Sequence, residues 1–480
     1  MSTQELLNGK CTPALEQLFR PETIAIAGAS AEPRGTSIGN SFIKRIEDMG
    51  FKGRIYAVNP SGGEVGGRRI YPSLLDIPEP VDFVISAIPA KHTPQLISDC
   101  AEKGVKLVHL FSAGFSELGN ETGVALESEV VQIARDAGVR LTGPNGMGIY
   151  SPGTGLAFDE AFSRKPGNVG WLAQSGRNGI YIVRDALLRG VYFSKAISYG
   201  NGADLNESDF IDYFSDDPET DIIAAYIEGV KDGRRFFRIL KEAAAKKPVI
   251  ILKGGNTEAG SRGVASHTAS IAGSDAVWSA VCKQAGAIRV NSLEGLADLL
   301  PVFNFLQPPK GRRVSIVGFG GGAGVLAADI CTDNGMSVPA SPPELQVKLR
   351  DMCGGDAGSI FMNPFDLWAG AGTNGISGAL EAIAGWDKTD LLLVHIQFDL
   401  NPSIREMVYK PYVSTLTRLA SKLNYRTAVV LDFVVTAEAK KLAIDVQSTL
   451  AEAGYAVFMS ITGAATALGR FIDYHERDRS

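Results

Sequence analysis

The feature that most constrains this chain is an opening that occurs three times: a proline, a short apolar stretch and a turn of small residues. The copies read PETIAIAGAS, PGNVGWLAQSG and PKGRRVSIVGFGGGAG, and their apolar stretches begin at Ile24, Val169 and Val314. Both spacings are 145 residues (169 − 24 and 314 − 169). Each copy is typical of the first β-strand and loop of an α/β domain. We therefore predict three consecutive α/β domains, which we place at residues 1–150, 151–305 and 306–480.

Charge and composition exclude several classes of partner. The net charge is −6 and no basic cluster is present, so we expect no nucleic-acid or membrane-surface binding. The N-terminus lacks the apolar core of a signal peptide and no apolar run approaches about 18 residues, so we expect a cytoplasmic protein. The five cysteines are scattered without a CxxC pair, so we expect reduced thiols and no metal site.

Small residues follow every predicted strand of the first domain. The first loop, GASAEPRGTSIGN, begins at Gly28, and a helix should start near Ser37 and present its N–H groups to a phosphate. The second strand ends at Asn59, where an NAD site usually has an acidic residue, so NAD is disfavoured. The carboxyl ends of parallel strands share one edge, so we expect an extended ligand there, although Gly28 alone also fits a simple turn. The candidate ligand-binding residues are Gly28, Ser30, Arg34, Asn59, Pro60, Ile88, Pro89, Ser112, Ala113, Gly114, Phe115 and Asn145.

The other two domains open with different loops. AQSGRNG should start a helix whose first N–H groups face an anion, which makes Gln174, Ser175, Gly176 and Arg177 candidate phosphate-binding residues. The loop GFGGGAG lacks the Lys-Ser/Thr pair of a Walker loop, and we interpret it as close packing of strand on helix. We expect the acidic stretch SDDPETD, residues 215–221, to be a solvated turn.

One of the five histidines stands apart from any apolar pattern. His267 lies in VASHTASIAG, among small and hydroxylated residues, and we expect a loop there. A neutral imidazole is a nucleophile, and small neighbours would allow a phosphorylated ring to move between sites. Taken alone, His267 equally fits a solvated loop residue or a buried, hydrogen-bonded one. We expect His109 and His395, inside apolar strands, to be packed in cores, and His92 and His475 to lie at the surface.

Ten segments spread over nearly the whole chain form one set: GAS (28–30), VNP (58–60), SAGFSE (112–117), GPN (143–145), QSG (174–176), YIEGVKDGRRF (226–236), LKGG (252–255), SHT (266–268), AGSD (272–275) and NPFD (363–366). By these segments the chain resembles the α subunit of the NDP-forming (ADP-forming) acyl-CoA synthetases, relatives of succinyl-CoA synthetase. YIEGVKDGR followed by LKGG and SHT is the most specific part.

The resemblance implies a fold and roles for these residues. It implies a Rossmann-like coenzyme A-binding domain, then two flavodoxin-like ligase domains, the first carrying the phosphohistidine. By the resemblance His267 is that phosphohistidine and Glu228 the carboxylate that holds its ring, which agrees with the way a carboxylate fixes an imidazole tautomer. The QSG loop would bind the phosphoryl group. The implied reaction joins a small carboxylic acid to coenzyme A through an acyl phosphate, while ATP becomes ADP.

The family's nucleotide step belongs to an ATP-grasp module, which we do not find in this sequence. We therefore expect a separate ATP-grasp β subunit that binds Mg and ATP or ADP, in an α2β2 hetero-oligomer. The sequence departs from the family at Ala173 and Arg177, where members read SQSGALG, and at Ala269, where they read SHTGALAG. Arg177 would bind phosphate, grip a polar group of the acid or point to solvent. A catalytically inactive regulator that binds coenzyme A or acyl-CoA stays open as an alternative, and an NAD-dependent oxidoreductase is the weakest one.

Overall fold

The computed structural model describes residues 12–31, 37–268, 274–318, 320–354, 358–367, 372–398, 402–432 and 434–477. Within these ranges, the side chains of residues 12–14, 264–268, 402–405, 407 and 408 are also not described. The chain forms two compact units, one of residues 1–184 and 192–291 and the other of residues 185–191 and 292–480. In the described ranges no helix is both long enough and apolar enough to cross a bilayer.

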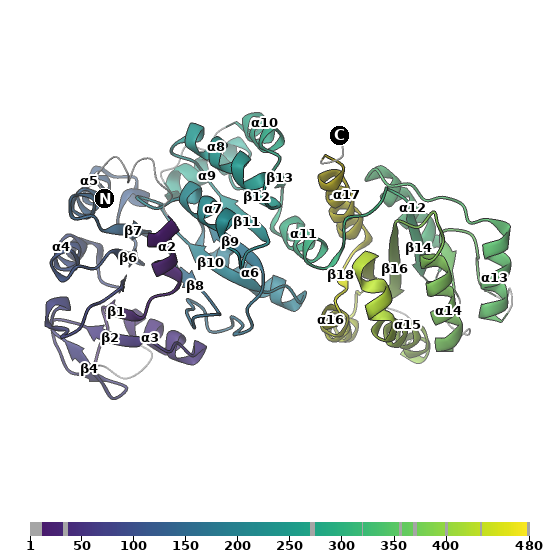
Figure 1. The fold of residues 1–480 in the computed structure, drawn as a ribbon, viewed down its shortest axis with the longest axis horizontal. Helices are drawn as coiled ribbons and strands as arrows, with labels where there is room; N and C mark the ends of the chain where they lie inside the picture. The colour runs from purple at the N-terminus through teal and green to yellow at the C-terminus, as the bar shows by residue number, and fades with distance from the viewer. Residues whose placement is uncertain are drawn as a thin grey trace. The chain divides into compact units, whose positions relative to one another are not determined.

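The first unit begins with a seven-stranded sheet in the order β3-β4-β2-β1-β5-β6-β7 (Figure 1). All neighbours pair in parallel except β3 and β4. Leaving out β3, the order is that of a Rossmann fold, and it reverses at β1, so the loops after β1 and β5 diverge at a crevice. The strands are β1 (Thr23–Ala27), β2 (Arg54–Val58), β3 (Glu64–Val65), β4 (Arg68–Tyr71), β5 (Phe83–Ser86), β6 (Leu107–Leu110) and β7 (Arg140–Thr142), and the helices are α2 (Thr12–Phe19), α3 (Ile38–Met49), α4 (Thr93–Lys103) and α5 (Glu121–Ala137).

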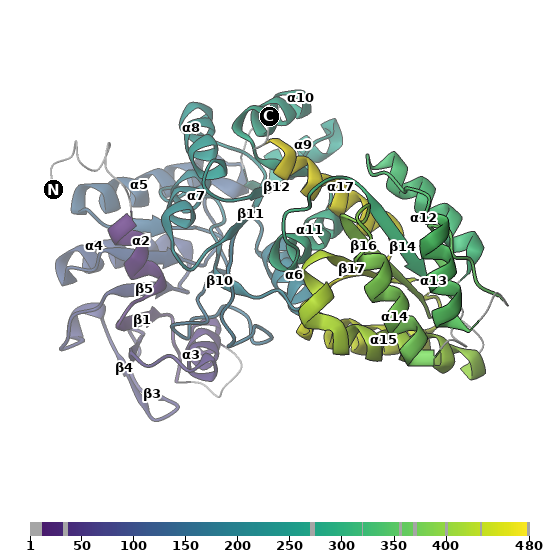
Figure 2. The ribbon, with the colours of Figure 1, turned by 45° about the vertical axis from the view of Figure 1, so that its right-hand side comes forward.

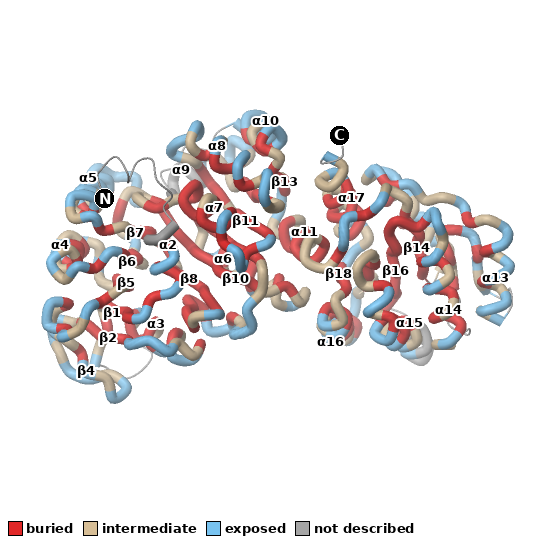
Figure 3. The backbone as a smooth tube through the Cα atoms, viewed as in Figure 1, coloured by how far each residue is buried: buried red, intermediate tan, exposed pale blue. Residues whose placement is uncertain are grey.

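A second sheet completes this unit, in the order β13-β12-β11-β9-β10-β8. Only β8 is antiparallel, and the other five have the flavodoxin-like order with β9 as first strand. Figure 3 shows its central strands buried, as expected for a parallel sheet covered on both faces. The strands are β8 (Gly148–Tyr150), β9 (Val169–Ala173), β10 (Phe193–Ser198), β11 (Ile222–Ile227), β12 (Val249–Lys253) and β13 (Ile288–Val290), and the helices are α6 (Gly176–Leu188), α7 (Glu207–Asp216), α8 (Gly233–Ala244), α9 (Glu258–Thr268) and α10 (Asp275–Ala285).

The second unit holds a five-stranded parallel sheet, β15-β14-β16-β17-β18, again in flavodoxin-like order. Helices cover both of its faces (Figure 2), and α13 to α16 supply most of the apolar core on one of them. The strands are β14 (Val314–Gly318), β15 (Phe365–Asp366), β16 (Leu391–Gln397), β17 (Thr427–Asp432) and β18 (Ala456–Phe458), and the helices are α11 (Leu293–Phe305), α12 (Gly321–Asp333), α13 (Pro343–Cys353), α14 (Gly372–Ala384), α15 (Pro402–Leu423), α16 (Ala437–Glu452) and α17 (Ile461–Arg477).

The predicted α/β class, with three mainly parallel sheets, is thus confirmed. The three repeated openings are β1, β9 and β14, which begin at Thr23, Val169 and Val314. The domain boundaries at residues 150 and 305 stay a prediction.

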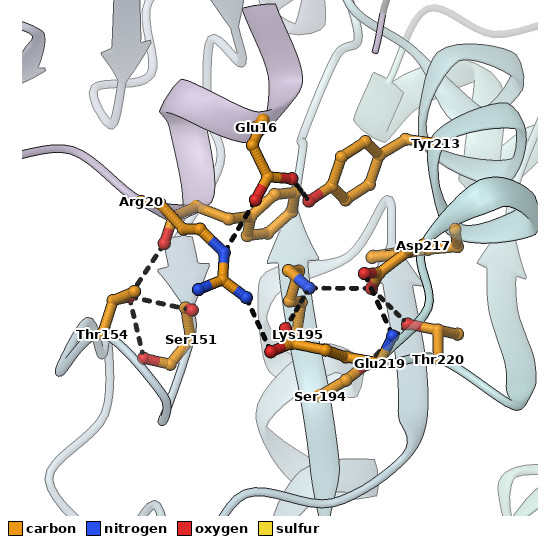
Figure 4. A network of polar contacts seen from close by, with 12 residues as sticks. Glu16, Arg20, Ser151, Thr154, Ser194, Lys195, Tyr213, Asp217, Glu219 and Thr220 are labelled. Carbon is orange, nitrogen blue, oxygen red and sulfur yellow. Dashed lines mark hydrogen bonds and ion pairs between the residues drawn. The ribbon is translucent and has the colours of Figure 1, made fainter. Parts of the chain in front are cut away.

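A buried lysine corrects the prediction that residues 215–221 form a solvated turn. The Lys195 side chain, 1% exposed, lies 2.8 Å from the Asp217 carboxylate and 2.7 Å from that of Glu219 (Figure 4). Asp217 is itself buried, because a buried ammonium must be paired with carboxylate. The same cluster reaches the N-terminal helix, since Arg20, directly after α2, forms an ion pair of 2.6 Å with Glu219.

Candidate functional site

The loop after β1 is built around Gly28. Its φ is +102°, and a Cβ there would lie 2.6 Å from the Ala87 carbonyl oxygen. The residue must therefore be glycine, both for its backbone angle and for the close approach of the loop after β5. Ser37 caps α3 as predicted, and its hydroxyl donates to the Gly28 carbonyl at 2.8 Å.

Two asparagines hold the start of this loop, Ala29 and Ser30. The Asn40 side chain accepts from the Ser30 N–H and donates to the Ser30 carbonyl, both at 2.9 Å. Asn59 donates from Nδ2 to the Ala29 carbonyl at 2.6 Å. The backbone of Ser30 is thus used inside the loop, and Asn59 positions the loop. The sequence reasoning missed Asn40, although an asparagine in the first turn of a helix after a glycine loop is a usable signal. Arg34 lies outside the described residues.

The remaining strand ends of the first sheet meet at one edge. The Ser112 hydroxyl donates to the Ile88 carbonyl at 2.5 Å, and the Asn145 N–H donates to the Ser112 carbonyl at 3.1 Å. The structure therefore brings Ile88, Ser112 and Asn145 together, next to Gly28 across β5. Pro60, Pro89 and Ala113 are exposed at this edge.

In the loop after β6, a carboxylate of the protein accepts hydrogen bonds from the backbone amides. The N–H groups of Gly114 and Phe115 donate to Glu117 Oε1 at 2.5 and 3.0 Å. Although burial acts against it, the hydrogen bonds from Asn201 and from these amides lower the pKa of Glu117 below its usual range. Gly114 and Phe115 therefore serve an internal anion, and the sequence reasoning missed Glu117.

In the second sheet, Gln174 joins the ends of two neighbouring strands. The side chain is buried, and its Oε1 accepts from the N–H groups of Glu228 and Gly229 at 2.8 and 3.2 Å. The predicted phosphate loop after β9 and the predicted carboxylate after β11 are thus directly connected. Gln174 therefore positions the backbone of Glu228 and Gly229.

Glu228 is buried with a tyrosine beside it. The Tyr226 hydroxyl donates to Glu228 Oε1 at 3.1 Å, and burial, with the charge of Glu228, raises the pKa of Tyr226. A Cβ at Gly254 would lie 2.5 Å from the Tyr226 hydroxyl oxygen. This contact gives a physical reason for the first glycine of the LKGG segment.

The loop between these residues starts α6. The Asn178 N–H donates to the Ser175 hydroxyl oxygen at 3.4 Å and the Gly179 N–H to the Ser175 carbonyl at 2.9 Å. Across the described part of the chain, no acceptor binds the N–H groups of Gly176 and Arg177, which are first-turn groups without a helical partner. The Arg177 side chain is exposed.

A second buried lysine lies at the same edge. Lys253 ends β12, is 1% exposed, and its Nζ lies 5.5 Å from the centre of the Trp278 ring. Burial, and then the charge of Arg289, lower the pKa of Lys253. The sequence reasoning did not single it out, although a lysine after four apolar strand residues was a signal.

His267 lies in the last turn of α9, where we expected a loop. Its side chain is outside the described residues, as is Ala269, so its distance from Glu228 stays a prediction. Helix α9 packs against the short helix η3 (Ser116–Leu118), which follows the Gly114 loop.

The other histidines are largely as predicted. His109 is fully buried between the Thr142 hydroxyl at 2.7 Å and the Gly146 carbonyl at 3.0 Å, and burial lowers its pKa to about 4. His395 is also buried. His92 is exposed and His475 is half-buried.

The second unit gives a role to the NPFD segment. Asn363 donates to the Val314 carbonyl and accepts from the Ile316 N–H, so it pairs with the edge of β14. Asp366 accepts from the N–H groups of Gly320 and Gly321 at the start of α12. These residues line a small cavity together with Gly318 and His395.

Two family models match the first unit. A CoA binding domain matches residues 22–152, and a succinyl-CoA ligase like flavodoxin domain matches residues 166–303. The acetate–CoA ligase [ADP-forming] I α subunit of Pyrococcus furiosus is 38% identical over 407 residues, which cover 83% of this chain and 87% of that protein. The chain belongs to the ADP-forming acetate–CoA ligase α-subunit family.

Further relatives agree with this membership. The second α subunit of the same organism, acetate–CoA ligase [ADP-forming] II, is 40% identical over 74% of this chain and 77% of its own length. The dinucleotide forming acetyl-coenzyme A synthetase 1 of Ca. Korarchaeum cryptofilum, solved with phosphate and ADP, has a TM-score of 0.83 and 30% identity over 97% of both chains. ADP-forming acetate–CoA ligases are acid–thiol ligases, so the chain is an enzyme subunit, and the predicted family is confirmed.

Proposed function

We propose that the chain is the coenzyme A-binding, phosphohistidine-carrying subunit of an NDP-forming acyl-CoA synthetase. The observation that carries the proposal is the buried Glu228 carboxylate, linked through Gln174 to the loop that starts α6. A carboxylate in this setting can accept from one imidazole nitrogen and leave the other to attack phosphorus. In this proposal the first-turn N–H groups of Gly176 and Arg177, with Ser175, bind the incoming anion.

Coenzyme A is a substrate in this proposal, and the edge of the first sheet fits it. Gly28 lets the loops after β1 and β5 meet closely at the crevice where this fold binds ligands. Asn40 and Asn59 hold Ala29 and Ser30 at the start of the first loop. We propose that the nucleotide and thiol arm pass along Gly28, Ile88, Ser112 and Asn145.

The reaction runs in balanced steps. His267 takes a phosphoryl group from ATP and releases ADP. The carboxylate of the acid attacks the phosphohistidine and forms acyl phosphate, which restores the imidazole. The thiolate of coenzyme A then attacks the acyl carbon and expels inorganic phosphate. Positioning and charge stabilisation supply most of the rate, as is usual in phosphoryl transfer.

The nucleotide step requires a partner. We propose a separate ATP-grasp β subunit that holds Mg and ATP or ADP, in an α2β2 assembly. The relatives from Pyrococcus furiosus are named as α subunits, which supports a second kind of subunit. A small carboxylic acid is the remaining substrate.

The test is to mix the full chain with an ATP-grasp β subunit and Mg-ATP. The intact mass of the chain then shows whether it gains a phosphoryl group, and acid treatment shows whether that group is acid-labile. We expect one phosphoryl group on the wild type, none on His267→Ala, and about 10²- to 10⁴-fold slower labelling of Glu228→Gln. His92→Ala, an exposed histidine, is the matched control. The β subunit must be one that phosphorylates the α subunit of its own enzyme. If such a β subunit does not label this chain, the catalytic proposal is rejected. Coenzyme A binding without labelling would favour the regulator.

A further inference from the structure

The Tyr226 side chain is hydrogen-bonded to the Glu228 carboxylate. The Tyr226 hydroxyl donates to Glu228 Oε1 at 3.1 Å. A tyrosine hydroxyl has one proton, so this contact fixes the donor on one oxygen of the carboxylate.

The backbone around Tyr226 fixes where its hydroxyl lies. Tyr226 is paired with Ala173 of β9 on one side and Leu252 of β12 on the other, so its Cα sits in the centre of the sheet. The Tyr226 hydroxyl lies beside Gly254, and a Cβ at that position would collide with the hydroxyl oxygen. Burial raises the pKa of Tyr226, so the hydroxyl stays protonated, and a donor, across the working pH range.

We propose that Tyr226 is a positioning residue that sets the orientation of the Glu228 carboxylate. The inference rests on the proposed function, since it needs Glu228 as the partner of His267.

The test compares Tyr226→Phe with wild type in the phosphorylation assay and by crystallography. Tyr226→Phe removes only the donor, and we expect phosphohistidine formation to slow by about 10- to 100-fold, the size of a hydrogen bond to a charged group. Coenzyme A affinity should not change in this variant, because the loops of the first sheet are untouched.

The matched control is Tyr192→Phe. Tyr192 lies in the same unit, and the Lys165 ammonium lies over the face of its ring, a contact that phenylalanine keeps. This variant should label at the wild-type rate.

Crystal structures separate the inference from the proposed function. We expect the Glu228 carboxylate to rotate in Tyr226→Phe. An unmoved carboxylate overturns the inference, and so does a wild-type labelling rate in Tyr226→Phe. If the wild type is not labelled at all, the proposed function fails, and the carboxylate position alone still decides whether Tyr226 orients Glu228.

Discussion

The turn after β9 and the turn after β14 look alike in sequence, because each joins a buried strand to a helix through glycines. They differ in what meets the helix N-terminus. At α12 the Asp366 carboxylate of the protein itself accepts from Gly320 and Gly321. At α6 no carboxylate of the described residues accepts from the N–H groups of Gly176 and Arg177. A glycine-rich turn is thus available to an outside anion only where the protein has not supplied one.

The two turns also differ in how they are held. Gln174 fixes the turn after β9 from within the loop, by accepting two backbone N–H groups of the next strand end. The turn after β14 is held from outside the loop, by Asp366 in β15. The predictions below test these differences.

The largest effect should come from Gln174→Ala. Two buried backbone donors lose their acceptor, and we expect the free energy of unfolding to fall by about 2 to 4 kcal/mol. Urea unfolding of the full chain measures it. Gln132→Ala, on the exposed face of α5, is the control and should stay within about 0.5 kcal/mol. A similarly small change in Gln174→Ala would mean that the turn after β9 does not depend on this side chain.

Removing the Asp366 carboxylate at the start of α12 should lower the free energy of unfolding by a smaller amount. Asp366→Ala deletes an acceptor at a helix start, and we expect a loss of about 1 to 2 kcal/mol. Asp366→Asn keeps an acceptor oxygen and should lose less at neutral pH. Burial raises the pKa of Asp366, so its folded form binds a proton more readily than its unfolded form. Its stabilising contribution is therefore full below the unfolded pKa and declines as the pH rises through the folded pKa.

Thermal unfolding across pH 4 to 8 checks this sign. The stability of wild type relative to Asp366→Asn should decrease as the pH rises. The opposite trend would show that the amides of Gly320 and Gly321 outweigh burial at this carboxylate.

The smallest effect on stability should come from Arg177→Ala. The side chain is exposed, and a cation at a helix start is slightly unfavourable, so unfolding should change by less than about 0.5 kcal/mol. If Arg177 contributes to acid specificity, the ratio of rates among acetate, an aryl acid and a dicarboxylic acid should shift. Unchanged rates on all three would leave Arg177 as a solvent-facing residue.

Local patterns predicted the fold well. The apolar stretches at Ile24, Val169 and Val314 mark the first strand of each sheet, and Ser37 is an N-cap, because such features depend on neighbours within a few residues. The same holds for the turn at Gly28, whose positive φ is a local property.

The sequence could not predict contacts between distant segments. Asp217 lies in an acidic run that is typical of a solvated turn, yet Lys195, on β10, holds it in the interior. Only the folded chain brings these two side chains together. Glu117 is different, because it belongs to the SAGFSE segment and binds amides two and three residues before it, so this local contact was open to prediction.

The polar contacts of α2 with Tyr213 and Glu219 bear on the order in which the chain can fold. Glu16 accepts a hydrogen bond from Tyr213, 197 residues later, and Arg20 pairs with Glu219 (Figure 4). At about 5 to 20 residues per second, a ribosome needs about 10 to 40 s to deliver these partners after α2 has emerged. During that interval α2 can pack against β6 of the first sheet, but it lacks the polar partners that Tyr213 and Glu219 supply. These contacts of α2 are therefore completed only after residue 219 has been made.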